Sequence, residues 1–264
     1  MVPDPKTLQR GKRKRQIDAG RKKIIFRAFR IFEAAGCVFA TCLVEGKKML
    51  IFNDFDQSPN CLKTKILLKE LAIEYQERRL TRAEIRSPAY RAKFPTAQAP
   101  AIEDGEIRIA ESGAIALYLA QKHGRLMPAD PARRALMLQA MFVEASLLAP
   151  TVGGQGLFGE LYKPETEQNV ARIAELREKA IRVGQVLSDL LGDKPFFAEE
   201  FSIADIQLYA AVSKSLAGRA FGTPAENLVR WCARMTERPC VAAAREEYVH
   251  YRTPASDLLT AAYS

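Results

Sequence analysis

The chain has 264 residues, of which 48% are hydrophobic and 27% are charged, and its net charge is +9. This length and composition give one large domain or two ordinary ones, and they exclude a disordered chain, a collagen-like chain and a disulfide-stapled miniprotein. The excess positive charge lies in residues 1–48, where thirteen Lys and Arg stand against four acidic residues; the rest of the chain holds 27 of each. We therefore expect no nucleic acid among the partners of the folded part.

Cysteine and histidine are few and scattered. No two of the five cysteines form a CxxC pair, and there are only two histidines. This argues against a zinc ribbon, a His-rich metal site or a Ser-His-Asp triad, and it fits a reducing compartment better than a secreted disulfide framework. No run approaches the roughly 18 uninterrupted apolar residues of a membrane span. We expect a cytoplasmic protein with no metal and no membrane partner.

Residues 1–48 form a basic leader with four interpretations. A signal peptide fits poorly, because the apolar run at 34–44 starts late and lacks a usable cleavage site. An amphipathic helix at a membrane surface and a basic targeting or nucleic-acid patch are the second and third. The fourth, which we favour, is a disordered or mis-assigned start, in which Met49 is the true first residue and 45–48 is a translated ribosome-binding site. A product starting at Met49 should then keep full activity.

From Met49 onward the pattern indicates a compact α/β domain over residues 49–124. Alternating apolar residues predict strands, and apolar residues at helical spacing predict helices. In chain order the predicted elements are a strand at 49–55, a helix at 59–74, a strand at 75–80, a polar helical stretch at 82–94, a hairpin at 100–110 and a helix at 112–123. Asp104-Gly105 predicts the hairpin turn, and Gly124 ends the last helix.

The second half of the chain indicates an all-helical domain. Pro128 and Pro131 mark a linker at 125–131, the helical domain follows at 132–250, and a tail follows at 251–264. Helical periodicity covers 132–148, 165–191, 202–216, 225–235 and 240–248. Ser202 and Asp205 predict a capping box, with the carboxylate as its acidic member.

Four local motifs resemble the glutathione S-transferase superfamily in their order and spacing. They are Ser58-Pro59-Asn60-Cys61-Leu62-Lys63, Ala99-Pro100-Ala101-Ile102, Glu111-Ser112 and Phe201-Ser202-Ile203-Ala204-Asp205. The resemblance implies an α/β plus all-α fold, in which a thioredoxin-like N-terminal domain is followed by a helical-bundle C-terminal domain. It also implies glutathione as a co-substrate, and a homodimer that pairs the α/β domain of one subunit with the helical domain of the other.

The resemblance implies five glutathione-binding residues: Gln98, Ala99, Pro100, Glu111 and Ser112. It implies a cis Ala99–Pro100 bond that turns the Ala99 backbone toward the cysteinyl unit, and it places Gln98 near the glycyl carboxylate. A helix N-terminus favours a carboxylate, Ser112 can add a donor there, and Glu111 can take the γ-glutamyl ammonium. Residues of these types also commonly do no more than cap a helix. The family's usual Gly and Val are Ala97 and Ala99 here, which puts thiol placement in doubt.

The catalytic position implied by the resemblance is Ser58, with Cys61 as its competitor. A free thiol has a pKa near 8.5, so a hydroxyl donor at a helix N-terminus can stabilise the glutathione thiolate. Serine followed by proline is also a common helix start. Cys61 would instead support mixed-disulfide chemistry, but it falls inside the first helical turn, where we expect a small buried hydrophobe.

The resemblance leaves three possible functions to compare. The first is a glutathione transferase of detoxification, which activates the thiol for attack on an electrophilic small molecule. The second is a non-catalytic interaction protein with this fold, and the third is a glutathione-dependent disulfide reductase that uses Cys61. The electrophile would lie between the domains, near Met141, Phe142, Phe158 and Tyr162. Its identity and the class within the superfamily cannot be read from the sequence.

Overall fold

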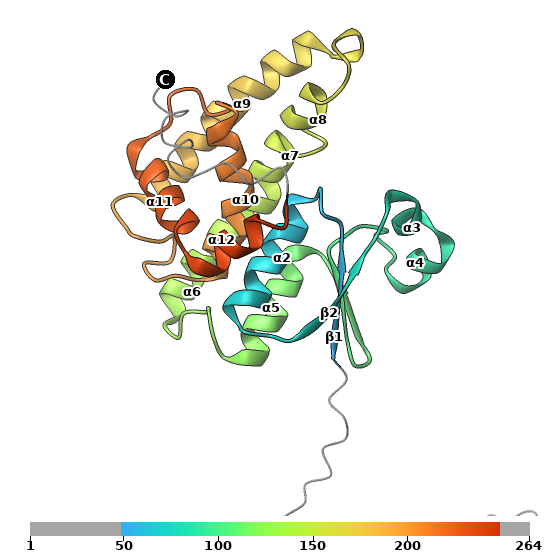
Figure 1. Ribbon diagram of the computed structural model, residues 1–264. Helices are drawn as coiled ribbons and strands as arrows, with labels where there is room; N and C mark the ends of the chain where they lie inside the picture. Colours follow the sequence, from blue (N-terminus) through green and yellow to red (C-terminus); the bar gives the residue numbers. More distant parts are fainter. Residues whose placement is uncertain (1–48, 249–264) are drawn as a thin grey trace, which may run out of the picture. The chain divides into compact units, whose positions relative to one another are not determined.

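The computed structural model describes residues 49–248, so the expected leader at 1–48 and the expected tail at 251–264 lie outside the described residues. The first half is an α/β domain (Figure 1). Its elements are β1 (Leu50–Asp54), α2 (Pro59–Glu70), β2 (Tyr75–Arg79), α3 (Arg82–Arg86), α4 (Pro88–Lys93), β3 (Ala101–Asp104), β4 (Ile107–Ala110) and α5 (Ser112–His123). This is the predicted order of elements.

The four strands form one mixed sheet in the order β2-β1-β3-β4. Strand β1 is parallel to β2 and antiparallel to β3, and β3 and β4 form the predicted hairpin. Helices α2 and α5 cover one face, where Phe52, Leu62 and Ile115 share a buried core. Around α3 and α4 a smaller cluster includes Ile85 and Phe94. The domain has the thioredoxin-like arrangement that the sequence predicted.

Local backbone chemistry shifts three predicted boundaries. Helix α2 ends at Glu70 rather than Glu74, because Ala72 adopts a left-handed φ of 54°. The polar helical stretch divides at Ser87, whose ψ of 149° suits a residue that precedes proline. The hairpin turn lies at Gly105-Glu106, one residue later than predicted, with Gly105 at a φ of 64°.

The second half contains helices and a single isolated bridge, Ala198–Glu200, among the described residues. Its elements are α6 (Pro131–Val143), the π turn η1 (Glu144–Leu148), α7 (Ala149–Val152), α8 (Leu157–Leu161), the 3-10 turn η2 (Glu165–Glu167), α9 (Val170–Leu191), α10 (Ile203–Ala217), α11 (Glu226–Thr236) and α12 (Pro239–Arg245). The predicted capping box is present at Ser202 and Asp205. Helix α10 packs against α2 and α5, so it joins the helical half to the α/β domain.

Three parts of the helical half differ from the prediction. The helix expected at 165–191 begins at Val170, where Asn169 caps it, and residues 165–167 form the separate turn η2. The helix expected to end at Leu148 continues through η1 into α7, and α8 was not predicted. A glycine-rich stretch separates α7 from α8, and a Cβ at Gly156 would lie 2.2 Å from the Thr151 carbonyl oxygen. By length and composition alone, Pro131–Leu161 could cross a membrane, with a mean hydropathy of 1.5. In the structure α6 packs against α10.

Candidate functional site

The predicted site residues gather at one edge of the sheet because of the strand register. Asn53, near the end of β1, pairs with Ala101 at the start of β3, and Ala101 pairs with Ala110 at the end of β4. The segment that follows β1, the segment that precedes β3 and the start of α5 therefore lie next to one another. These segments carry the predicted serine, proline and Glu-Ser motifs.

Ser58 begins α2 without capping it. The residue has extended backbone angles, with φ −91° and ψ 122°, and Pro59 occupies the first turn. Its half-buried side chain accepts no hydrogen bond from the backbone of the helix. The hydroxyl lies within hydrogen-bonding reach of the Cys61 thiol. The structure therefore gives no support to a role for Ser58 as a simple capping residue.

Cys61 is the small buried hydrophobe that the sequence predicted. It is fully buried, and the backbone N–H of Phe55 donates to its sulfur at 3.3 Å. Burial raises the pKa of this thiol well above its usual range, and the nearby Asp54 carboxylate raises it further. The thiol is therefore protonated at neutral pH and poorly suited to act as a nucleophile.

The first turn of α2 also carries a polar chain that the sequence reasoning missed. The Lys63 ammonium donates to Asn60 Oδ1 at 2.9 Å and to Glu144 Oε1 at 2.5 Å. Lys63 and Glu144 are both buried, although they belong to different halves of the chain. A Lys on the buried face of a predicted helix was the available signal, because charged residues are rarely buried unless they are paired.

The segment that precedes β3 has the predicted cis bond between Ala99 and Pro100. Pro100 is buried and Gln98 is exposed. The Gln98 carbonyl accepts a hydrogen bond from the Tyr90 hydroxyl at 2.9 Å, which fixes this segment to α4. Ala97 has a φ of 47°, a conformation that glycine adopts more easily. That geometry explains why a glycine would suit this position.

Glu111 and Ser112 begin α5, as predicted. Glu111 has a φ of 72°, and its exposed side chain makes no capping hydrogen bond. The Ser112 hydroxyl donates to Gln207 Oε1 at 3.1 Å, and Gln207 Nε2 donates back to the Ser112 carbonyl at 3.3 Å. Gln207 lies on α10, so the start of α5 is tied to the helical half. No local pattern indicated Gln207, because it lies 95 positions from Ser112.

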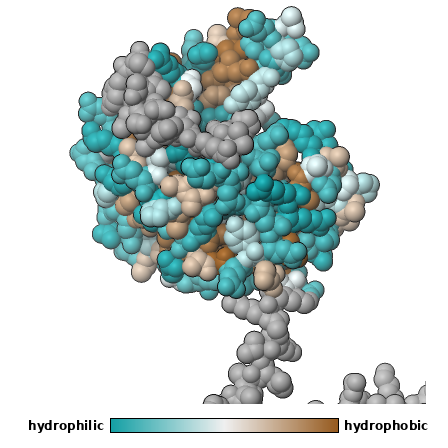
Figure 2. Space-filling view, viewed as in Figure 1, coloured by the Kyte–Doolittle hydropathy of each residue, from teal (hydrophilic) through white to brown (hydrophobic). Residues whose placement is uncertain are grey.

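The four residues expected near an electrophile fall into two sets. Met141 and Phe158 are buried, whereas Phe142 and Tyr162 are each 67% exposed. Met141 lies beside Gly113, the neighbour of Ser112. Phe158 stacks on Tyr162, with the Lys214 ammonium over both rings. In Figure 2 hydrophobic atoms gather near the top of the view, over the region of α8 and the start of α9.

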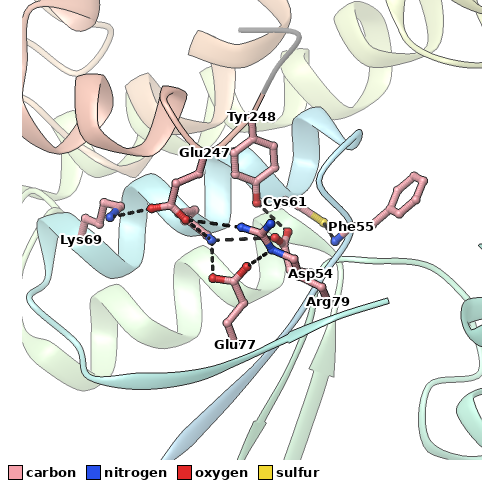
Figure 3. Close-up of polar contacts among 9 residues, drawn as sticks. Asp54, Phe55, Cys61, Lys69, Glu77, Arg79, Glu247 and Tyr248 are labelled. Carbon is pink, nitrogen blue, oxygen red and sulfur yellow. Dashed lines mark hydrogen bonds and ion pairs between the residues drawn. The ribbon is translucent and has the colours of Figure 1, made fainter. Parts of the chain in front are cut away.

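A cluster of charged side chains lies beside Cys61, between α2, β1, β2 and the end of the described chain (Figure 3). Asp54 and Lys65 are fully buried, and Lys65 donates to Glu77 at 2.6 Å and to Glu247 at 2.7 Å. The Tyr248 hydroxyl donates to Asp54 at 2.5 Å. Burial raises the pKa of Asp54. Glu247 and Tyr248, the last two described residues, thus bind the buried Lys65 and Asp54 side chains of α2 and β1.

Within residues 49–248, no three His, Cys, Asp or Glu side chains come together as potential metal ligands. The site offers hydroxyl, amide and backbone donors at two helix starts.

Comparisons with known proteins decide the family. Residues 50–121 match the family model of the glutathione S-transferase N-terminal domain. An uncharacterized GST-like protein of Streptococcus mutans is 31% identical over 237 residues, which cover 80% of this chain and 87% of that protein. The chain belongs to the glutathione S-transferase superfamily. It is also 28% identical to the disulfide-bond oxidoreductase YghU of Escherichia coli, over 77% of this chain and 80% of the relative.

Solved structures agree with this membership. A glutathione transferase from Pseudomonas putida, with one glutathione disulfide bound per subunit, superposes with a TM-score of 0.69 at 26% identity. The match covers 76% of this chain and 93% of that transferase. The thioredoxin-like domain and the helical half of this chain therefore have the fold of the glutathione S-transferase superfamily.

Proposed function

We propose that this protein is a glutathione transferase that activates the glutathione thiol for attack on an electrophilic small molecule. The observation that carries the proposal is Ser58, a helix-start serine whose hydroxyl does not cap its own helix. It stands at the same sheet edge as the cis Ala99–Pro100 bond and the Glu111-Ser112 pair. The membership of the superfamily and the glutathione disulfide bound to the Pseudomonas putida transferase support this proposal.

In this proposal the two segments after β4 and before β3 bind glutathione. The N-terminus of α5 takes the γ-glutamyl carboxylate, because its N–H groups and dipole favour negative charge. The exposed Glu111 carboxylate takes the ammonium group. The Ala99 backbone pairs with the cysteinyl unit beside Pro100, and Gln98 reaches the glycyl carboxylate.

Ser58 then stabilises the thiolate. The glutathione thiol loses its proton to solvent, and the Ser58 hydroxyl turns from the neutral Cys61 thiol to the anionic sulfur, where a hydrogen bond is stronger. The dipole at the start of α2 adds to this effect. The thiolate donates its electron pair to the electrophilic carbon, so that a C–S bond forms and the leaving group departs with its own electron pair.

Disulfide reduction is a second candidate, favoured by the relative named a disulfide-bond oxidoreductase. The protonated, buried Cys61 is a poor thiol for it. Two glutathione molecules would supply both thiols instead: one thiolate displaces a thiol from the disulfide, and the second attacks the mixed disulfide. The products are glutathione disulfide and two thiols, so electrons balance without a protein cysteine.

The deciding experiment is the thiolate absorbance of enzyme-bound glutathione, titrated with pH for the wild type and Ser58→Ala. We expect the bound thiol pKa to rise in the variant and conjugation at pH 7 to fall about ten- to a thousand-fold, with part of the rate returning at higher pH. Ser87→Ala is the matched control, because Ser87 also precedes a proline at a helix start but accepts a capping hydrogen bond from the Tyr90 N–H. An unchanged titration in Ser58→Ala would overturn the assignment.

Assembly and location complete the proposal. We propose a cytoplasmic homodimer that acts in detoxification, with the near-neutral folded part offering little charge repulsion to self-association. A monomer mass by light scattering at micromolar protein would contradict the dimer.

A further inference from the structure

A buried ion pair joins the helical half to the first turn of the helix that carries Ser58. The Lys63 and Glu144 side chains are 2% and 7% exposed, and their charged atoms lie 2.5 Å apart. Two charges leave water for such a position only when close partners compensate their lost hydration. Lys63 has a second partner, the Oδ1 atom of Asn60 at 2.9 Å. The three side chains form one continuous chain from the helical half to the start of α2.

The backbone around Glu144 is also unusual. Glu144 is the first residue of the π turn η1, which interrupts the helix between α6 and α7. Single π turns inside α-helices are rare and frequently mark functional sites. Phe142, only two residues earlier, is 67% exposed, whereas Glu144 is 5% exposed. The turn therefore begins at the residue whose carboxylate is directed into the fold toward α2.

The Lys63 ammonium decides how the Asn60 carboxamide is oriented. An ammonium group can only donate, so its neighbour must be the amide oxygen, which accepts, and not the amide nitrogen, which is itself a donor. The Nδ2 group is consequently turned away from Lys63, and in the part of the chain that the structure describes it donates to no partner. Asn60 is half-buried and lies two residues after Ser58. Its N–H donor is thus held at the same helix start as the Ser58 hydroxyl.

We propose that Glu144 is a positioning residue of the glutathione site, which acts through Lys63 to hold the Asn60 amide donor toward the substrate sulfur. The inference rests on the proposed function. It assigns the helical half of the chain a part in thiol activation, because Glu144 belongs to that half. If the pair is lost, the carboxamide can rotate and present its oxygen, which repels a thiolate.

The test replaces the pair by apolar residues, as Lys63→Met with Glu144→Leu, since such replacements often preserve stability. We expect a near-normal melting temperature and a small change in the KM for glutathione. The pKa of the bound thiol should rise by about one unit and kcat at pH 7 should fall about ten-fold. The matched control is Lys179→Met with Glu175→Leu, an exposed ion pair on α9.

A double-mutant cycle with Asn60→Ala separates positioning from simple scaffolding. If the pair acts through Asn60, its removal should change the bound thiol pKa only when Asn60 is present. An additive effect, or a folded double variant with the wild-type thiol pKa, would overturn the inference. If the double variant does not fold, the Asn60→Ala variant alone tests the inference. An unchanged pKa of the bound thiol in that variant would overturn the inference. The proposed function fails separately, if the wild type itself does not bind glutathione and lower its thiol pKa.

Discussion

Helices α2 and α10 both begin with a serine, and their first turns differ in almost every contact. Ser202, at the start of α10, is fully buried; it accepts from the Ala204 N–H and donates to Asp205 Oδ2 at 3.2 Å. Ser58, at the start of α2, is half-buried and accepts nothing from its helix. The residue type and the position in the helix are the same, so neither identifies a functional residue.

The difference lies in what surrounds each turn. Asp205 accepts hydrogen bonds from the Phe197 and Ser202 N–H groups and from the Trp231 indole at 2.9 Å. Every donor there already has a partner within the protein. At the start of α2 the Ser58 hydroxyl faces the neutral Cys61 thiol, a weak acceptor, and can turn from it to an external group. A fully bonded helix start stabilises the fold, whereas one with weakly bonded donors can bind a ligand.

We expect the largest effect from a substitution in the first turn of α10. Asp205→Ala leaves four buried donors without their acceptor, so we expect it to lower the free energy of unfolding by about 3–5 kcal/mol. Ser58→Ala is the matched comparison and should change stability by less than about 0.5 kcal/mol, because no capping bond is lost. Urea unfolding of both variants measures this. Equal losses would show that the two helix starts have the same structural role.

The pH dependence of stability should follow Asp205. Burial raises its pKa from 3.8 to about 6 in the folded protein. The folded state therefore binds the proton more tightly, so this contribution to stability is complete below about pH 4 and falls by up to about 3 kcal/mol as the pH rises to about 6. The difference between the unfolding curves of the wild type and Asp205→Asn isolates it. A difference that is constant across this range would contradict the prediction.

A smaller effect is expected at the second helix start of the site. Ser112→Ala should raise the KM for glutathione about ten-fold and leave that for the electrophile nearly unchanged, if the hydroxyl serves the carboxylate. Gln207→Leu removes the partner of Ser112 without removing the hydroxyl. Steady-state kinetics of both variants distinguish the roles. Equal kinetic effects in the two variants would show that the Ser112 hydroxyl serves only the contact with α10.

The smallest effect should come from Cys61. Because burial keeps this thiol protonated, Cys61→Ala should leave the conjugation rate nearly intact. The native thiol should also react slowly with an alkylating reagent at neutral pH. Mass spectrometry after timed alkylation measures this reactivity. Loss of activity in Cys61→Ala would favour a reductase that uses this cysteine.

Local patterns predicted the parts of the molecule that local physics determines. Alternation and helical spacing gave the order of the α/β elements, and the Ser202 capping box followed from four adjacent residues. The cis Ala99–Pro100 bond came only from the family resemblance, since most X–Pro bonds are trans. Helix α8 was missed because glycines surround it, and glycine disfavours helix.

The rest of the site depends on contacts between distant residues. Glu144 meets Lys63 across 81 positions, and Gln207 meets Ser112 across 95. No window of sequence contains both members of either pair, so periodicity and capping patterns cannot reveal them. A Lys on the apolar face of a predicted helix indicates that the side chain has a buried partner, but it does not indicate which residue that partner is.

The hydrogen bond from Tyr248 to Asp54 has a consequence for synthesis of the protein. Its two residues are 194 positions apart, and Tyr248 is the last residue of the described fold. At roughly 5–20 residues per second, translation takes roughly 10–40 seconds to travel from the first strand to its partner. During that interval Asp54 lacks the hydroxyl that later hydrogen-bonds to it. The surroundings of β1 are therefore complete only after residue 248 has been synthesised.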